Sequence, residues 1–203
     1  MFIVFDGIDG GGKTTQLNRL VDWIESEGHS VITCKDPGST ELGEKLREML
    51  LTEQQMPISM RAEMMLFTTA RTELIQQIVK PALKAGKSVV LDRYILSTVV
   101  YQGHAGKLDP DEIRLVNQIA TEGVQPDLTF ILDLDTKSAM QRLGDSLDRM
   151  EARGETYFSQ VRQGFLQEAS ASPEKIVVIN ADQDPDSIHH EILNVVKARS
   201  SDS

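Results

Sequence analysis

A segment near the N-terminus has the residue types and spacing needed to hold phosphate groups. Gly7-Ile8-Asp9-Gly10-Gly11-Gly12-Lys13-Thr14 fits the pattern G-x-x-x-x-G-K-[ST]. Glycines let the backbone N–H groups curl around phosphate oxygens, and the N-terminus of a following helix adds partial positive charge. Lys13 would neutralise the β and γ phosphates, and Thr14 would offer its hydroxyl to Mg²⁺. A chance match in a chain of this length has odds of about one in a hundred, so the segment predicts a nucleotide-binding loop.

A second candidate group, Asp92-Arg93-Tyr94, follows the apolar run Ser88 to Leu91. Open α/β sheets bind their ligands at the carboxyl ends of the strands. Asp92 is suited to a Mg²⁺ shell, and the planar fork of Arg93 is suited to a phosphate. The alternative is a surface ion pair between the two side chains. The phosphate-binding loop favours the functional interpretation.

Short apolar runs predict the strands that position these groups. They are Phe2 to Phe5, Val31 to Cys34, Ser88 to Leu91, Leu128 to Leu132 and Ile176 to Ile179. Their hydrophobicity is continuous rather than alternating, which is typical of strands covered on both faces of a parallel sheet. Strands that alternate with helices imply right-handed crossovers. We therefore expect an α/β fold with a five-stranded parallel sheet and helices on both faces, in one domain over residues 1–203.

Apolar spacing and stop signals predict the helices between the strands. The helices expected are one through Leu17, Leu20, Val21 and Ile24 that ends at Gly28, one from about Ser59 to Ala85, one from Asp109 to Glu122, and one after Pro185. Residues 143–155 form the least apolar internal stretch, either a mobile flap or a solvated loop. We expect this stretch to contribute little to the core.

Charge and composition limit the partners. The 203 residues include 21 Lys and Arg against 31 Asp and Glu, a formal net charge of −10. The whole molecule should therefore repel nucleic acid and anionic membranes. The single cysteine, Cys34, cannot form an internal disulfide, and no apolar run reaches the roughly 18 residues of a membrane span. A cytoplasmic setting is expected.

The loop alone leaves several functions open. A GTPase would carry an Asn-Lys-x-Asp motif, which does not occur in this sequence, and a motor or large ATPase would need a longer chain. A small phosphotransferase remains, or a nucleotide-dependent switch that acts through a protein partner. The loop alone leaves the acceptor of such a phosphotransferase open.

Further motifs occur in the order found in thymidylate kinases, and the chain resembles that family over nearly its whole length. The matching stretches are Phe5 to Thr15, Asp36-Pro-Gly-Ser-Thr40, Ala62 to Arg71, Asp92-Arg-Tyr94 continuing through Ser97-Thr98 to Tyr101-Gln-Gly103, and Leu147-Asp-Arg-Met-Glu151. The resemblance implies a P-loop NTPase fold with a mobile lid, here about residues 143–155. It implies transfer of the γ-phosphate of ATP to dTMP with Mg²⁺, which gives dTDP and ADP for dTTP synthesis, and it implies a homodimer.

The resemblance also implies the two substrate sites. On the dTMP side, Phe67 would lie against the thymine face and Arg71 on a thymine carbonyl; without the resemblance, Phe67 would be read as core and Arg71 as a solvated charge. The other dTMP residues implied are Arg47 and Arg93 at the phosphate, Gln102 at the base edge, Ser97 in the pocket, Tyr101 at the 2′ position, Asp36 and Pro37 in the acceptor wall, and Asp9 toward the sugar. For Asp9, stabilisation of the loop is an equal alternative.

On the ATP side, the resemblance implies one continuous loop. Its members are Gly7, Ile8, Asp9, Gly10, Gly11, Gly12, Lys13, Thr14 and Thr15. Thr14 and Asp92 would hold the metal. Arg142 would stack on adenine, or it is a plain solvated arginine. Asn180-Ala181-Asp182 resembles the adenine-side loop, although Asn180 stands where an Asp is usual.

The attacking oxygen of a nucleoside monophosphate is already ionised at neutral pH, so catalysis needs charge neutralisation rather than a general base. The expected catalytic residues are Lys13, Arg93, Asp9 and a transition-state arginine. In this family that arginine lies in the loop or in the lid. The loop position here is Gly10, and the lid stretch Gly144-Asp145-Ser146 has no arginine, which leaves Arg149 and Arg153. Arg149, within the matched lid motif, is the prediction.

Overall fold

The sheet at the centre of the molecule is entirely parallel, with the strand order β2-β3-β1-β4-β5. The computed structural model describes residues 1–52, 57–143 and 148–201. The strands are β1 (Phe2–Asp6), β2 (Val31–Lys35), β3 (Ser88–Asp92), β4 (Leu128–Asp133) and β5 (Ile176–Asn180). The predicted α/β class and the five parallel strands are therefore confirmed.

The register brings the carboxyl ends of the central strands to one edge. Phe5 in β1 pairs with Asp92 in β3, and Asp6 pairs with Ile131 in β4. The loop that follows β1 and the residues that follow β3 therefore emerge side by side. This is the edge at which open parallel sheets bind ligands.

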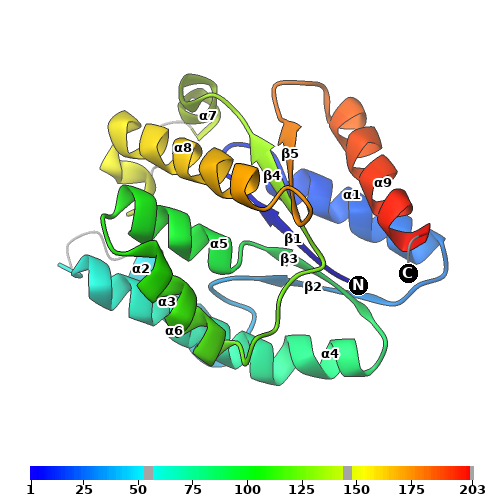
Figure 1. Cartoon of the computed structure of the whole chain (residues 1–203), viewed down its shortest axis with the longest axis horizontal. Helices are drawn as coiled ribbons and strands as arrows, with labels where there is room; N and C mark the ends of the chain where they lie inside the picture. Colours follow the sequence, from blue (N-terminus) through cyan, green and yellow to red (C-terminus); the bar gives the residue numbers. More distant parts are fainter. Residues whose placement is uncertain (53–56, 144–147, 202–203) are drawn as a thin grey trace.

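Helices cover both faces of the sheet (Figure 1). The α-helices are α1 (Lys13–Ser26), α2 (Glu41–Leu51), α3 (Met60–Leu74), α4 (Lys80–Lys84), α5 (Ile95–Thr98), α6 (Pro110–Ala120), α7 (Thr136–Leu143), α8 (Glu155–Ala171) and α9 (Pro185–Ser201). Two π-helical segments, η1 (Ile75–Val79) and η2 (Val99–Ala105), and the 3₁₀ turn η3 (Glu151–Arg153) complete the described elements.

Alternate residues of β1 face two different cores. Ile3 and Phe5 belong to a cluster with Leu20 of α1 and Ile192 of α9, whereas Phe2 and Val4 pack with residues of α3, η1 and α4. Every β1 side chain is buried. This double burial explains why the strand reads as a continuous apolar run.

The predicted helix from Ser59 to Ala85 is present as three consecutive segments, α3, η1 and α4. The Ser59 hydroxyl accepts a hydrogen bond from the N–H of Ala62 and caps the start. Pro81 cannot donate a backbone hydrogen bond, and the π-helical turn η1 ends two residues before it, where the regular pattern would be interrupted. The helix ends before Gly86, whose φ is +74°.

The predicted lid segment is only partly described, because residues 144–147 lie outside the described residues. This gap includes the stretch Gly144 to Ser146 and the first residue of the lid motif. The expectation that the segment contributes little to the core is wrong at Met150, which is 5% exposed and belongs to the main hydrophobic cluster. The N–H of Arg149 also donates to the carbonyl of Leu51 at 3.0 Å, so tertiary contacts offset the polar composition.

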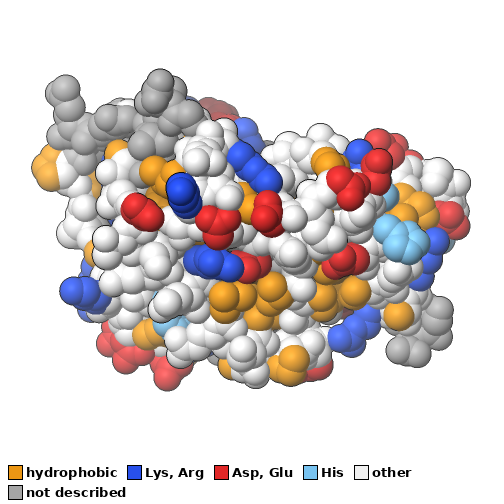
Figure 2. Space-filling view, turned by 90° about the horizontal axis from the view of Figure 1, so that it is seen from above, with side chains coloured by type: hydrophobic (Ala, Val, Ile, Leu, Met, Phe, Trp, Pro, Cys, Tyr) orange, Lys and Arg blue, Asp and Glu red, His pale blue; other side chains and the backbone are white. Residues whose placement is uncertain are grey.

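Acidic and basic side chains are interspersed on the face seen in Figure 2, so this face carries no large field of a single sign. Among the described helices, not one combines the length and the apolar character needed to span a membrane.

Candidate functional site

At two positions in the loop between β1 and α1, the backbone conformation and the neighbouring atoms tolerate only glycine. Gly7 and Gly10 have φ values of +123° and +81°, in the region that favours glycine. A Cβ atom on Gly7 would lie 2.7 Å from the carbonyl oxygen of Leu132, and one on Gly10 would lie 2.8 Å from that of Ala139. The loop is thus seated against the end of β4 and against α7.

The ammonium of Lys13 folds back over this loop. Its Nζ donates hydrogen bonds to the carbonyl oxygens of Gly7 at 3.2 Å and Ile8 at 3.0 Å, and it lies 3.4 Å from Oδ1 of Asp9. Burial and the neighbouring Arg93 lower the pKa of Lys13. The ammonium is therefore held among oxygen acceptors at the mouth of the loop, where phosphate oxygens could replace them.

Arg93 connects the loop to the end of β3. Its Nη2 lies 2.5 Å from Oδ1 of Asp9, and its Nη1 donates to the carbonyl of Gly7 at 2.9 Å and to Oγ of Ser97 at 3.1 Å. Burial raises the pKa of Asp9, but Arg93 and Lys13 outweigh it and hold that pKa well below its usual range. Asp9 is therefore an ionised carboxylate between two cations.

A cavity of about 480 Å³ lies in front of the loop. It is lined by Asp9, Gly10, Gly12, Lys13, Thr14, Thr15, Lys35, Asp36, Arg47, Asp92, Arg93 and Arg142. We call this the phosphate cavity, because its basic side chains suit an anion although the whole chain is acidic.

Asp92 and Thr14 meet the requirements of a Mg²⁺ site in the phosphate cavity. Oδ1 of Asp92 is buried and has no hydrogen-bond partner among the described residues, and both residues line the cavity. The described residues contain no cluster of three acidic, His or Cys side chains able to hold a metal alone. One carboxylate and one hydroxyl suit Mg²⁺, which keeps waters and phosphate oxygens as its other ligands.

A second cavity, here called the acceptor cavity, adjoins the first. Its lining includes Phe67, Arg71, Ser97, Thr98, Tyr101, Gln102, Pro37, Leu51, Asp148 and Met150. Four residues line both cavities, namely Asp9, Asp36, Arg47 and Arg93. The structure therefore brings all the residues predicted for dTMP to one cavity, and this cavity opens toward the loop.

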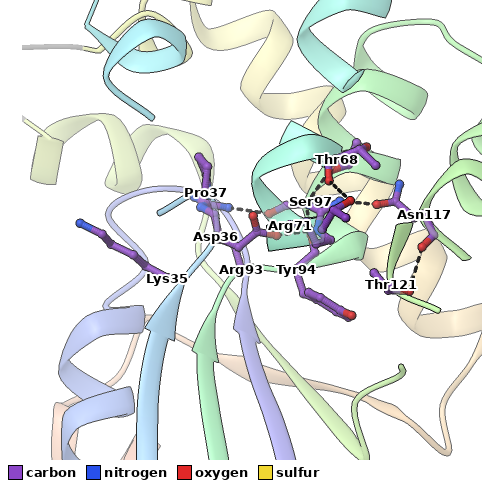
Figure 3. Close-up of polar contacts among 12 residues, drawn as sticks. Lys35, Asp36, Pro37, Thr68, Arg71, Arg93, Tyr94, Ser97, Asn117 and Thr121 are labelled. Carbon is purple, nitrogen blue, oxygen red and sulfur yellow. Dashed lines mark hydrogen bonds and ion pairs between the residues drawn. The ribbon is translucent and has the colours of Figure 1, made fainter. Parts of the chain in front are cut away.

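Arg71 is the most deeply buried cation of the acceptor cavity, and Figure 3 shows it between Asp36 and Asn117. Its Nε lies 2.5 Å from Oδ2 of Asp36, its Nη1 donates to Oδ1 of Asn117, and its Nη2 donates to Oγ1 of Thr98 at 2.8 Å. Because its side chain is only 1% exposed, the alternative of a solvated helix charge is wrong. Phe67 lies one turn earlier on α3 and is also buried.

The turn after β2 forms the wall between the cavities. The Asp36-Pro37 peptide bond is cis, and Nη1 of Arg47 donates to the carbonyl of Pro37 at 2.9 Å. Figure 3 shows the Lys35 side chain pointing away from the Asp36 and Arg71 pair. Lys35 lines the phosphate cavity instead.

The arginine predicted to stack on adenine and the arginine predicted for the transition state lie in different places. Arg142 is at the loop, where its Nη1 is 3.3 Å from the carbonyl oxygen of Gly10. Arg149 is not brought to the phosphate cavity, because both of its terminal nitrogens donate to the buried carboxylate of Glu63.

Sequence reasoning missed several polar residues of this region. Asp6 is fully buried at the end of β1, and its Oδ1 accepts from Oγ of Ser97 at 2.6 Å. Asn117 binds Arg71, and Glu63 binds Arg149. Asp6 had a usable signal, since it is an acid at the carboxyl end of an apolar run. The contacts of Glu63 and Asn117 join segments that are distant in sequence.

Comparison with known proteins decides the family. The thymidylate kinase family model matches residues 5–192. The chain belongs to the thymidylate kinase family. Its relatives in this family include a thymidylate kinase of Fervidobacterium nodosum, 39% identical over 98% of this chain and 99% of that protein, and one of a Sulfurihydrogenibium species, 40% identical over 98% of each.

The solved structures agree with this assignment. The crystal structure of thymidylate kinase from Ehrlichia chaffeensis superposes with a TM-score of 0.80 at 32% identity, and the alignment covers 97% of this chain and 98% of that one. Thymidylate kinases are nucleoside monophosphate kinases, which use a P-loop NTPase fold to transfer a phosphoryl group. This class of phosphotransferase, rather than a nucleotide-dependent switch, is therefore the class of the chain.

Proposed function

We propose that the chain transfers the γ-phosphoryl group of ATP to dTMP, which gives dTDP and ADP for dTTP synthesis. The observation that carries this proposal is the meeting of the two cavities at Asp9, Arg47 and Arg93. A donor held by the loop and an acceptor seated on Phe67 would face each other at these shared residues. In-line transfer between two phosphates requires such an arrangement.

On the donor side, the backbone N–H groups from Gly7 to Thr15 and the ammonium of Lys13 would hold the phosphates of ATP. Arg142 would cover the adenine, since its exposed guanidinium reaches over the loop from α7. Thr14 and Asp92 would ligate Mg²⁺. When bound, Mg²⁺ supplies positive charge that offsets the repulsion between donor and acceptor.

On the acceptor side, Phe67 would stack on thymine, Arg71 would bind a thymine carbonyl, and Gln102 would bind the base edge. Tyr101 would occupy the space of a 2′-hydroxyl, while Ser97 would line the pocket. The Asp36 carboxylate holds Arg71 in place, and the carbonyl of Pro37 holds Arg47. Arg47 and Arg93 would receive the acceptor phosphate, because both line the two cavities.

Catalysis would rest on positioning and charge. Two multiply charged phosphates a few ångströms apart repel by several kcal/mol in a low-dielectric site. Lys13 and Arg93 would offset this charge, and Asp9 would orient both cations. Arg149 stays a prediction as the transition-state arginine, and it would have to leave Glu63 to act directly on the phosphates.

We also propose a homodimer and a cytoplasmic setting, where ATP and deoxynucleotides are available. Exposed apolar side chains on neighbouring helices support the dimer, namely Met65 on α3 and Leu115 and Ile119 on α6, which are 44%, 60% and 72% exposed. Their burial between two copies would be favourable. Light scattering on the Leu115→Glu, Ile119→Glu double variant should report a monomer where the wild type is a dimer.

An ADP-release assay with ATP and Mg²⁺ tests the activity, with dTMP, dUMP, dCMP or UMP as acceptor and one reaction without acceptor. We expect turnover that depends on dTMP and falls with the other acceptors. Equal rates with all four would reject the dTMP pocket. ATP hydrolysis that does not depend on any acceptor would reject the proposed transfer to dTMP.

A further inference from the structure

A buried carboxylate that no substrate role requires joins the lid to the acceptor cavity. Glu63 lies in the first turn of α3 and is fully buried. It accepts hydrogen bonds from Gln102 of η2 and from Arg149 and Arg153 of the lid segment. Burial of a carboxylate is costly unless it is paired and hydrogen-bonded. These contacts satisfy that requirement, and they join segments that are far apart in the chain.

The two oxygens of Glu63 serve different partners. Oε2 lies 2.6 Å from Nη1 of Arg149 and 2.6 Å from Nη2 of Arg153, whereas Oε1 lies 2.9 Å from Nε2 of Gln102. An ionised carboxylate can only accept hydrogen bonds, so the side-chain amide of Gln102 must present its NH₂ to Glu63. The amide oxygen of Gln102 is then directed away from Glu63, and Gln102 lines the acceptor cavity.

A second set of hydrogen bonds connects the lid segment to η2, the element that carries Gln102. Nη1 of Arg153 donates to the hydroxyl of Tyr157 at 2.8 Å, and that hydroxyl donates to the carbonyl of Tyr101 at 2.6 Å. The guanidinium of Arg153 also lies 4.9 Å from the centre of the Tyr157 ring. These contacts connect the lid segment to two consecutive residues of η2, Tyr101 and Gln102.

We propose that Glu63 is a positioning residue with two linked effects: it anchors the lid through Arg149 and Arg153, and it fixes the side-chain amide of Gln102 so that the cavity receives a hydrogen-bond acceptor. This inference rests on the proposed function, because it concerns how the protein recognises the base of the nucleotide that receives the phosphoryl group. The amide oxygen of Gln102 could accept a hydrogen bond from the N3–H of thymine. It would be mismatched with cytosine, because N3 of cytosine is also a hydrogen-bond acceptor. In this inference Arg149 affects catalysis as an anchor of the lid, bound to Glu63, and not by contacting the phosphates.

Base preference gives a readout that a purely structural role would not move. In Glu63→Gln, the new amide can donate as well as accept, so the Gln102 amide can turn and donate to cytosine N3. We expect the ratio of kcat/KM for dTMP to that for dCMP to fall about tenfold in this variant. Glu63→Asp keeps a group that only accepts and should retain the wild-type ratio. A wild-type ratio in Glu63→Gln would overturn the effect on Gln102.

The matched control is Glu122→Gln. Glu122 also accepts from a basic side chain and a glutamine amide, those of Lys80 and Gln76, but its side chain is 56% exposed. Its replacement should leave the base preference and kcat unchanged. If Glu122→Gln moved the ratio as Glu63→Gln does, the shift would not report the Gln102 amide, and the inference would be overturned.

A double-mutant cycle tests the lid anchor. We expect Glu63→Gln and Arg149→Ala each to lower kcat for dTMP about a hundredfold with little change in the KM for ATP, and we expect the double variant to resemble either single variant. If Arg149 must leave Glu63 to reach the phosphates, Glu63→Gln should keep or raise kcat, and Arg149→Ala should retain its full effect in that background. That result would overturn the anchor.

Thermal unfolding of each variant accompanies the kinetics. If Glu63→Gln does not fold, Glu63→Asp carries the test, because it should lower kcat while it keeps the preference for dTMP; an unchanged kcat or a lost preference would overturn the inference. Wild-type enzyme that fails to phosphorylate dTMP would reject the proposed function itself. If the wild type phosphorylates dTMP and a Glu63 variant shows altered kinetics, the result concerns the role of Glu63 and not the proposed function.

Discussion

The guanidinium of Arg71 and the carboxylate of Asp36 form an ion pair at 2.5 Å, and the two side chains are 1% and 0% exposed. They lie on different elements, because Arg71 belongs to α3 and Asp36 follows β2. A buried pair of this kind is costly to separate, since loss of one partner leaves the other charge without compensation. The pair therefore fixes the wall of the acceptor cavity.

The first prediction follows from this pair. Asp36→Asn should lower the free energy of unfolding by about 3–5 kcal/mol and raise the KM for dTMP, because Arg71 loses its counter-charge. Urea unfolding and steady-state kinetics measure the two effects. Asp186→Asn is the control, since Asp186 pairs with Arg19 but is 88% exposed, and it should change stability by less than about 1 kcal/mol. Equal losses in both variants would contradict the prediction.

The second prediction separates two glycines of the phosphate-binding loop. Gly10 and Gly12 have similar φ values of +81° and +85°, but a Cβ atom would clash with the Ala139 carbonyl only at Gly10 and would meet open space at Gly12. Gly12→Ala should therefore cost about 1–2 kcal/mol, the ordinary strain of a left-handed residue. Gly10→Ala should cost clearly more and raise the KM for ATP further. Chemical denaturation of the two variants in parallel decides this, and equal stability would disprove the role of the Ala139 contact.

The third prediction concerns the metal. Chelation with EDTA should stop turnover, and Asp92→Asn should raise the Mg²⁺ concentration for half-maximal activity by about tenfold or more, because a neutral amide replaces the unpartnered carboxylate oxygen. A Mg²⁺ titration at saturating ATP and dTMP measures the shift. Asp22→Asn on the exposed face of α1 is the control. An unchanged Mg²⁺ requirement in Asp92→Asn would remove Asp92 from the metal site.

The fourth prediction is a pH dependence away from the site. Burial raises the pKa of Glu168, but hydrogen bonds from Arg114 and His104 outweigh it and lower that pKa below its ordinary value of 4.5. A carboxyl group with a lowered folded-state pKa contributes stability above its unfolded pKa and loses it as the pH falls through the folded value. At pH 5 the wild type should therefore be about 1–2 kcal/mol more stable than Glu168→Gln. This difference should close as the pH falls from the ordinary pKa of 4.5 through the lower folded-state pKa, and urea unfolding at several pH values measures it. If the stability difference between the wild type and Glu168→Gln increased as the pH fell, the prediction would be wrong.

The sequence was sufficient to predict the elements whose signals are local. The continuous apolar runs predicted every strand in the described part of the chain, and the spacing of glycines before Lys13 predicted the loop that opens α1. Phe67 and Arg71 are four residues apart, so one helical face was expected to present both. Their common cavity agrees with that expectation.

Contacts between distant segments could not be predicted in the same way. From the sequence, Glu63 is an ordinary acidic residue in the first turn of a helix, where its charge interacts favourably with the helix dipole. In the structure it is buried and paired with Arg149 and Arg153. Met150 sits in a polar stretch but packs into the main core. In both cases the deciding partner lies tens of residues away, and periodicity carries no information about it.

Arg93 has a φ of +65°, in the region that favours glycine, and it is the only described residue whose guanidinium contacts Asp6, Gly7, Asp9 and Ser97 together. Glycine at this position would relax the backbone but would delete every one of those contacts, and any other side chain would keep the conformational penalty without the fork. We therefore expect almost no natural variation at position 93. When position 93 is randomised and cells are selected for growth, the surviving clones should almost all carry arginine.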